Sequence, residues 1–245
     1  MRKNYKMLLS YDGSRYYGWE HQPDTDTVQG KLEEAFFAVF GEIPEINGAG
    51  RTDAGVHARG MTANVWLDTV YPVNEIRRLL NENLPDDIAV LEIKAASDKF
   101  HARYSAVGKT YRYTCHCGEY RAVFDRKYVY ELDRIPDLEA MRKAAAILTG
   151  KHDFASFCRQ AAAYPSTVRV VDVISVEETN GYITFTFHGT GFMRNMVRIL
   201  VGTLLEVGFG KISVSEVEKI LYAKNREAAG YTAPAQGLCL MKVDY

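Results

Sequence analysis

Hydrophobic and polar positions alternate in several segments of the chain and recur at helical spacing in others. Near the amino terminus, residues 5–13 (YKMLLSYDG) alternate as a strand does and end in an Asp-Gly turn signal. From Thr27, a residue type that caps helices, apolar residues recur every three or four positions until Gly41. The pattern therefore predicts a strand, a turn and then an amphipathic helix.

The same mixture of patterns continues to the end of the chain. Strand patterns occur at 61–68, 87–96, 108–117, 126–132, 168–178, 181–189 and 237–245, and helix patterns occur at 73–84 and 137–150, with two more helices before the last strand. Asn180-Gly181 is a strong hairpin signal between two of these strands. This order favours antiparallel sheets covered by helices, an α+β architecture, over a doubly wound parallel sheet.

The two halves of the chain are comparable in size, and each mixes strands with helices. We expect an amino-terminal subdomain at residues 1–105 and a carboxy-terminal subdomain at 106–245. No Pro-rich or Ser-rich linker and no sequence repeat marks the boundary. The strand pattern at 105–117 (SAVGKTYRYTCHC) is therefore expected to link the subdomains through one continuous sheet.

Composition narrows the class of protein. Of the 245 residues, 47% are hydrophobic and 25% are charged, and no apolar run approaches the roughly 18 residues that span a bilayer. The amino terminus lacks the apolar core of a signal peptide, so we expect a cytoplasmic protein without membrane insertion. Its four cysteines are then expected to stay reduced, and Cys115-His116-Cys117 lacks the spacing of a metal site. We assign no metal.

Residues 48–60 (GAGRTDAGVHARG) combine four glycines with charged side chains. The stretch lacks the G-K-[ST] ending of a phosphate loop, and Asp53 stands where G-x-G-x-x-G requires a third glycine. A lone carboxylate between Arg51 and Arg59 also argues against a glycosidase pair and a carboxylate metal cage. Two interpretations remain: a turn aspartate that caps its own backbone, or a nucleophile or base that a nearby arginine keeps ionised.

Four motifs together resemble those of the TruA-type tRNA pseudouridine synthases. They are YDGSRYYGW at 11–19, GAGRTDAGVHARG at 48–60, GKTYRYT at 108–114 and GTGFMRNMVRILVGTLLEVG at 189–208, and the resemblance runs over residues 1–245. It implies the pseudouridine synthase fold, with two α/β subdomains sharing a largely antiparallel mixed sheet flanked by helices. It also implies a cofactor-free isomerase that converts uridine to pseudouridine at positions 38, 39 and 40 of the tRNA anticodon stem-loop. Members of this family are homodimers, with one tRNA bound across both subunits.

The resemblance also implies roles for single residues. Asp53 falls on the catalytic aspartate, which attacks C1′ of the ribose, attacks C6 of the base or removes the C2′ proton; the sequence does not choose among these routes. Tyr111 falls on the tyrosine that stacks on the target uracil, although its strand position also suits a core aromatic residue. Arg198 is expected to pair with Asp53, and Arg51 to enter the stem as the uridine leaves it.

The other basic residues of the motifs have less definite roles. We expect His57 to position its loop or to contact RNA, and Arg194 to be a solvated charge or an RNA contact. The candidates for phosphate contact are Arg15, Arg59, Lys109 and Arg112. Two hypotheses compete with a tRNA pseudouridine(38–40) synthase. One is a non-catalytic RNA-binding protein on the same scaffold, which would not need Asp53; the other is a related synthase acting on another tRNA position or RNA class.

Overall fold

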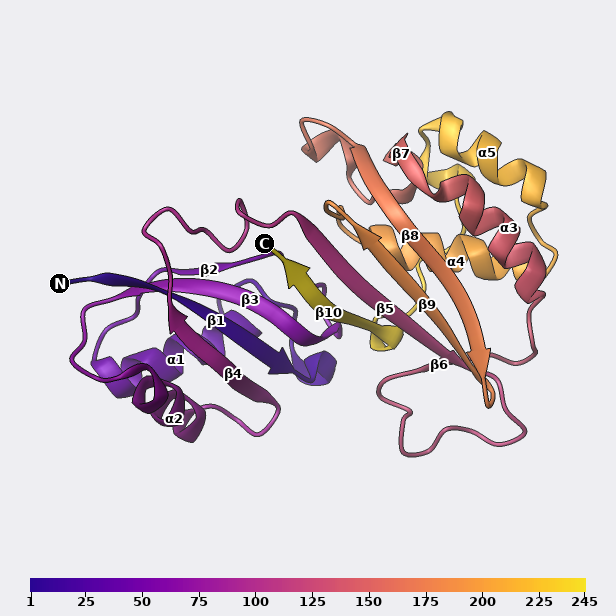
Figure 1. Ribbon diagram of the computed structural model, residues 1–245. Helices are drawn as coiled ribbons and strands as arrows, with labels where there is room; N and C mark the ends of the chain where they lie inside the picture. Colours follow the sequence, from indigo (N-terminus) through magenta and orange to yellow (C-terminus); the bar gives the residue numbers. More distant parts are fainter. The chain divides into compact units, whose positions relative to one another are not determined.

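The computed structural model describes all residues, Met1–Tyr245, and they form two compact units (Figure 1). The first unit contains Met1–Val107 together with Cys239–Tyr245, and the second contains Gly108–Leu238. The change of unit lies two residues after the expected boundary at 105/106. The last strand, expected in the carboxy-terminal subdomain, is grouped with the first unit. The α+β class is confirmed, because each unit combines a largely antiparallel set of strands with helices.

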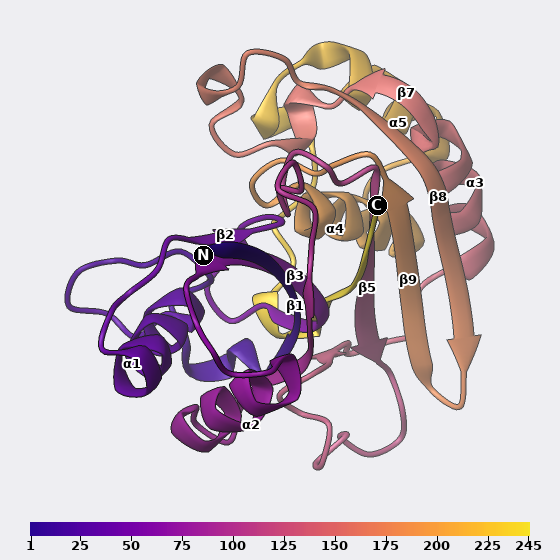
Figure 2. The same cartoon turned by 60° about the vertical axis from the view of Figure 1, so that its left-hand side comes forward.

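The first unit has five strands and two helices. The strands are β1 (Lys3–Tyr11), β2 (Ile46–Gly48), β3 (His57–Leu67), β4 (Ile88–Ala95) and β10 (Leu238–Asp244), and the helices are α1 (Val28–Phe40) and α2 (Val73–Asn83). The strand order is β4-β1-β3-β10, with β2 also paired to β3; β10 runs parallel to β3 and the other pairs are antiparallel. Both helices lie on the same face of this sheet (Figures 1 and 2).

Helix α1 has the limits that the sequence predicts. The Thr27 hydroxyl accepts a hydrogen bond from the backbone N–H of Gly30 at 3.1 Å, and Gly41 ends the helix with a left-handed φ of 72°. Its buried residues include Leu32 and Phe36, which belong to the predicted apolar face. Burying each such side chain contributes about 1.5–3 kcal/mol, so packing on the sheet rather than intrinsic propensity fixes this helix.

Strand β3 differs from the prediction because it begins at His57 instead of residue 61. Its first residues pair with β10, where His57 lies opposite Cys239, and a partner so distant in sequence leaves no local signal. Nine of its eleven residues are buried, which makes it a central strand. The buried amide of Asn64 is satisfied, since it donates to Asn4 Oδ1 and accepts from the N–H of Ala102.

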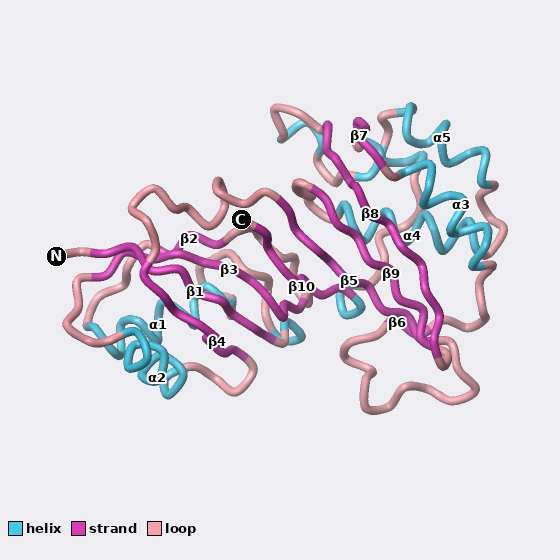
Figure 3. The backbone as a smooth tube through the Cα atoms, in the orientation of Figure 1, coloured by secondary structure: helices cyan, strands magenta, loops and turns pink.

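The second unit has five strands and three helices. The strands are β5 (Gly108–His116), β6 (Tyr130–Glu131), β7 (Gly150–Asp153), β8 (Val168–Thr179) and β9 (Tyr182–Gly189), and the helices are α3 (Leu138–Leu148), α4 (Met196–Gly208) and α5 (Val214–Ala223). The antiparallel order is β5-β9-β8-β7, with β6 parallel to β5. The three helices gather on one face of these strands (Figure 3).

Local signals predicted part of this unit correctly. Asn180 and Gly181 have φ values of 54° and 82°, as a type I′ hairpin turn requires, and they join β8 to β9. The predicted strand at 126–132 is wrong except for Tyr130–Glu131. In this loop the N–H of Tyr128 closes a turn onto the Asp125 carbonyl, and the Val129 carbonyl accepts the Gln236 side chain instead of a neighbouring strand.

None of the helices combines the length and hydrophobicity needed to cross a bilayer.

Candidate active site

Asp53 lies in the connection between β2 and β3, in a turn that the main chain closes. The N–H of Val56 donates to the Asp53 carbonyl at 3.1 Å, and Gly55 has a φ of 78°. Positive φ at the third residue is characteristic of type II turns and favours glycine there. Asp53 itself is half-buried. A backbone hydrogen bond therefore closes this turn.

The start of the chain packs against the Asp53 turn and supports it. Beside the turn, the Thr52 hydroxyl forms a buried hydrogen bond of 2.8 Å with the Tyr11 hydroxyl, and the Thr52 carbonyl accepts the N–H of Trp19 at 3.1 Å. Gly13 allows close packing, since a Cβ there would stand 2.0 Å from the carbonyl oxygen of Val56. The motifs at 11–19 and 48–60 are therefore parts of one packed arrangement.

His57 is buried at the first position of β3, with 5% of its surface exposed. Its Nδ1 accepts the backbone N–H of Gly13 at 3.0 Å and lies 3.1 Å from Asp12 Oδ1. His57 thus fastens the short 3₁₀ turn Gly13–Arg15 to β3.

Arg51 is exposed and forms a two-point ion pair with Glu20. Its Nη2 donates to Oε1 at 2.7 Å, and its Nε lies 2.5 Å from Oε2. Arg59 is exposed on β3 and forms no ion pair. The two arginines that flank Asp53 in sequence therefore differ, because one is held by a carboxylate and the other faces solvent.

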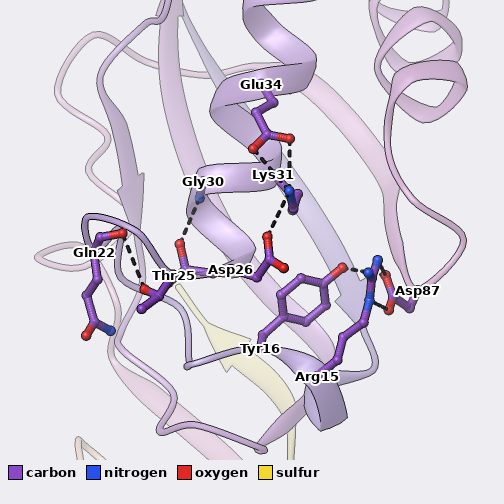
Figure 4. A network of polar contacts seen from close by, with 10 residues as sticks. Arg15, Tyr16, Gln22, Thr25, Asp26, Gly30, Lys31, Glu34 and Asp87 are labelled. Carbon is purple, nitrogen blue, oxygen red and sulfur yellow. Dashed lines mark hydrogen bonds and ion pairs between the residues drawn. The ribbon is translucent and has the colours of Figure 1, made fainter.

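Arg15 is tied into a separate network (Figure 4). Its Nε and Nη2 donate to the two carboxylate oxygens of Asp87 at 2.5 and 3.1 Å, and the Tyr16 hydroxyl donates to Asp87 Oδ1 at 2.5 Å. Burial acts to raise the pKa of Asp87, but the bonds from Arg15 and Tyr16 outweigh it and hold that pKa below its ordinary value. Burial and the bond to Asp87 raise the pKa of Tyr16.

In the second unit, β5 carries the aromatic residues of the GKTYRYT motif. Tyr111 is 8% exposed, and its ring meets the edge of Phe192 with 5.3 Å between centroids and 83° between planes. Tyr113 is fully buried on the same strand face and donates its hydroxyl to the Pro234 carbonyl at 2.8 Å; burial raises its pKa. Tyr113 is therefore a core residue, whereas the Tyr111 ring lies at the core's margin with its orientation fixed by Phe192.

Arg198 projects from α4, a helix in which ten of thirteen residues are buried. Its Nε donates to the Ala233 carbonyl at 2.7 Å, and the N–H of Ala233 donates back to the Arg198 carbonyl at 3.1 Å. The half-buried guanidinium is therefore held at its base by a buried helix and a neighbouring loop. Such pre-orientation lowers the entropy that a charged side chain loses when it binds a carboxylate.

The remaining basic residues of the second unit lie on β5 and before α4. Lys109 is half-buried opposite Gly189, and Arg112 is exposed opposite Thr186. Arg194 and Arg198, four residues apart in the sequence, do not both belong to α4. Asn195, with a left-handed φ of 61°, is the N-cap of α4, so Arg194 precedes the helix.

All four cysteines are in the thiol form, and no group of three or more His, Cys, Asp and Glu side chains is arranged to hold a metal ion. Cys115 is fully buried, and burial raises the pKa of its thiol.

Comparison with known proteins identifies the family of the chain. A family model described as tRNA pseudouridine synthase matches residues 7–105 and 144–245. The chain belongs to the tRNA pseudouridine synthase family. This is a family of enzymes, isomerases that act on tRNA. The matched ranges include Asp53 and Arg198, and Tyr111 lies between them.

Curated relatives match the whole length of this family member. The tRNA pseudouridine synthase A of Clostridium kluyveri is 42% identical over 243 residues, covering 99% of this chain and 100% of the relative. The enzymes of the same name from Syntrophotalea carbinolica and Citrifermentans bemidjiense are each 43% identical; they cover 98% and 99% of this chain and 95% and 98% of their own lengths.

The ten candidate site residues divide equally between the units. Arg15, Arg51, Asp53, His57 and Arg59 belong to the first, and Lys109, Tyr111, Arg112, Arg194 and Arg198 to the second. Around the Asp53 turn the structure brings His57 together with the 11–19 motif, but it ties Arg15 and Arg51 to carboxylates. Sequence reasoning missed Glu20, Phe192 and Ala233, the partners that orient Arg51, Tyr111 and Arg198; Glu20 directly follows the first motif, which was its one available signal.

Proposed function

We propose that this protein converts uridine to pseudouridine in tRNA and that Asp53 is its catalytic residue. The observation that carries the proposal is the match over nearly the whole chain to relatives named tRNA pseudouridine synthase A. The turn around Asp53 adds support, since backbone and side-chain hydrogen bonds hold it in place. A rigidly placed carboxylate suits chemistry that depends on the position of one acid group.

The reaction breaks the bond between C1′ of the ribose and N1 of uracil and forms a bond between C1′ and C5. The C5 proton leaves and N1 gains a proton, so the product is an isomer and nothing is oxidised or reduced. This balance requires no redox cofactor and no energy source. Asp53 acts by attack on C1′, by attack on C6 or by removal of the C2′ proton.

A stacked uridine must leave its stem to reach such a carboxylate, at a cost of a few kcal/mol. In our proposal Tyr111 stacks on the extruded uracil and is the candidate to take its C5 proton. Arg198 pairs with Asp53 and keeps it ionised, and Arg51 fills the vacated position in the RNA. Support comes from the fixed orientations of Tyr111 and Arg198 and from the planar Arg51 guanidinium, which suits both base stacking and phosphate contact.

We further propose uridines 38, 39 and 40 of the anticodon stem-loop as the targets. An enzyme that modifies three neighbouring uridines is expected to recognise the backbone and shape of the tRNA. Base edges are poorly accessible to side chains in the grooves of A-form RNA. A homodimer that binds one tRNA across both subunits would let a chain of net charge −1 present a basic surface. We also propose that the protein acts in the cytoplasm, where its tRNA substrate is found.

The test compares Asp53→Asn with the wild type and with Asp98→Asn, which removes a charge from an exposed aspartate that forms no ion pair. Wild type and Asp98→Asn should release tritium from tRNA labelled at uridine C5. Asp53→Asn should release none, while its Kd for tRNA stays within about tenfold of wild type. Tritium release by Asp53→Asn at the wild-type rate would refute the catalytic assignment and favour another active group.

A pseudouridine map of tRNA from a strain lacking the gene tests the target positions. Pseudouridine should disappear at positions 38–40 and return when the gene is restored. Loss confined to a site outside the anticodon arm would reject this substrate while leaving the chemistry of Asp53 intact.

A further inference from the structure

Strand β8 begins and β9 ends at the same end of the second unit's strands (Figure 1), and three arginines belong to the segments around this end. They are Arg159 in the loop after β7, Arg169 near the start of β8, and Arg194 just before α4. The N–H of Arg159 donates to the Arg194 carbonyl at 3.3 Å, which joins the two loops. We call these residues the arginine cluster.

Tyr164 lies between members of the arginine cluster. Its hydroxyl accepts the backbone N–H of Arg194 at 2.9 Å, and the Arg169 guanidinium lies 5.9 Å from the centre of its ring. Arg194 Nη1 donates to Gln160 Oε1 at 3.0 Å, and Arg169 Nη1 donates to the carbonyls of Ser166 and Val168. Two of the three guanidinium groups are therefore oriented by neutral partners.

No carboxylate forms an ion pair with the arginine cluster. The acidic side chains of the adjoining strands have other partners: Asp153 pairs with Lys224 at 2.9 Å, and Asp172 lies 2.6 Å from His188 Nδ1. Helix α4 begins directly after Arg194 and Asn195, so the positive end of its dipole adds to the same region. The cluster thus concentrates positive charge that the chain itself does not neutralise.

The arginine cluster adjoins the residues assigned to the target uridine through one short segment. From Phe192 to Arg198 the chain carries the ring that orients Tyr111, then Arg194 of the cluster, then Arg198. Phe192 and Arg194 are two residues apart, so the ring that contacts Tyr111 and a member of the arginine cluster belong to one short segment. Arginine suits phosphate contact because its planar fork binds two phosphate oxygens at once.

We propose that Arg159, Arg169 and Arg194 form a phosphate-binding site that holds the RNA backbone beside the target uridine. The inference rests on the proposed function and specifies where its substrate is gripped. Contacts of this kind fix register without reading bases. The site would therefore serve any tRNA whose backbone follows the same path.

The test measures tRNA binding by fluorescence anisotropy over a series of salt concentrations. The main variant is Arg159→Gln/Arg194→Gln. The matched control is Arg78→Gln/Arg142→Gln, which removes the same charge from exposed arginines that contact Glu75, Glu82 and Glu139. A third variant, Arg159→Lys/Arg194→Lys, keeps the charge but lacks the planar fork.

The cluster variant should bind tRNA roughly tenfold more weakly than wild type. The slope of the logarithm of its binding constant against the logarithm of the salt concentration should be smaller by about 0.7–0.9 for each phosphate that it no longer neutralises. Its KM should change more than its kcat. The lysine variant should show a salt slope close to that of wild type. The melting temperatures of all three variants should also stay close to that of wild type. Binding by the cluster variant with the Kd and slope of the control would overturn the proposal, as would weaker binding with an unchanged slope.

Wild-type protein assayed in parallel separates this inference from the proposed function. Suppose that wild type forms pseudouridine and that the cluster variant binds tRNA as the control does. This result would overturn the proposed phosphate site and leave the proposed reaction standing. Binding of tRNA without pseudouridine formation by wild type would refute the proposed reaction, and the salt slope of the cluster variant would still decide the phosphate site.

Discussion

Glu20 holds the guanidinium of Arg51 at two points, with N–O distances of 2.7 and 2.5 Å. Arg51 is the residue proposed to enter the RNA as the uridine leaves, so this ion pair must open before Arg51 can act. The Arg51 side chain is 68% exposed and that of Glu20 45%, and exposed pairs of this kind contribute about 0–1 kcal/mol. Glu20 is thus a weak competitor of the RNA for Arg51.

Replacing Glu20 by Gln should therefore strengthen tRNA binding by up to about fivefold, the factor that corresponds to 1 kcal/mol. The measurement is the Kd for tRNA at fixed salt. Loss of a negative charge alone would also favour RNA, so the same change is made in an Arg51→Ala background. There only the gain from the lost charge should remain, so the improvement in Kd should be smaller than in the wild-type background; an equal gain in both backgrounds would show that Glu20 acts on the phosphates directly and not through Arg51.

Phe192 packs against the ring of Tyr111, so Phe192→Leu should lower kcat/KM for tRNA by about twofold to thirteenfold. An edge-to-face aromatic pair contributes about 0.5–1.5 kcal/mol, which corresponds to this range. Tyr113→Phe is the matched control on the same strand, since it removes the hydroxyl bond to Pro234. It should cost about 1 kcal/mol of stability and leave kcat/KM near wild type. Equal kinetic losses in both variants would contradict the role of Phe192.

The features that sequence predicted correctly depend on neighbours along the chain. Thr27 and Gly41 bound α1 because capping uses hydrogen bonds to residues three or four positions away. Asn180-Gly181 specifies its hairpin through its own backbone angles. Such signals lie within a few residues of the structure they determine, so one chain without relatives is enough to recognise them.

The features that sequence did not predict depend on distant partners. Strand β3 begins at His57 because β10, some 180 residues later, pairs with it. Met193 and Val197 are spaced as in a helix, although α4 begins only after its N-cap Asn195. The apolar pattern therefore gave no sign that Arg194 lies outside the helix. The motif resemblance supplied the candidate residues, but the contacts that Glu20, Phe192 and Ala233 make with them are seen only in three dimensions.

Gly55 in the Asp53 turn has a φ of 78°, so Gly55→Ala should both destabilise the protein and misplace Asp53. A left-handed non-glycine residue costs about 1–2 kcal/mol. Gly41→Ala is a matched control, because Gly41 has a φ of 72° and open space where a Cβ would stand, at the end of α1 away from the turn. Both variants should lose similar stability in urea, but only Gly55→Ala should lose tenfold or more in kcat. Similar kcat values would mean that the turn does not control Asp53.

The network of Arg15, Tyr16 and Asp87 predicts a specific dependence of stability on pH. Burial opposes ionisation of Asp87, but the bonds from Arg15 and Tyr16 prevail, so its pKa is lower in the folded protein than in the unfolded chain. A depressed carboxyl pKa stabilises the fold above the unfolded value of about 3.9, and this contribution is lost as pH falls through the folded pKa.

Asp87→Asn should therefore reduce the free energy of unfolding by about 1–2 kcal/mol at pH 7, since the pair is partly exposed. The difference from wild type should shrink as the pH is lowered from 5 to 3. Urea unfolding at pH 7, 5, 4 and 3 measures it, with Asp98→Asn as the control that should follow wild type throughout. Other carboxylates contribute equally to both proteins and cancel in the difference. A constant gap between wild type and Asp87→Asn at every pH would mean that the Asp87 bonds stabilise the fold without coupling to its ionisation.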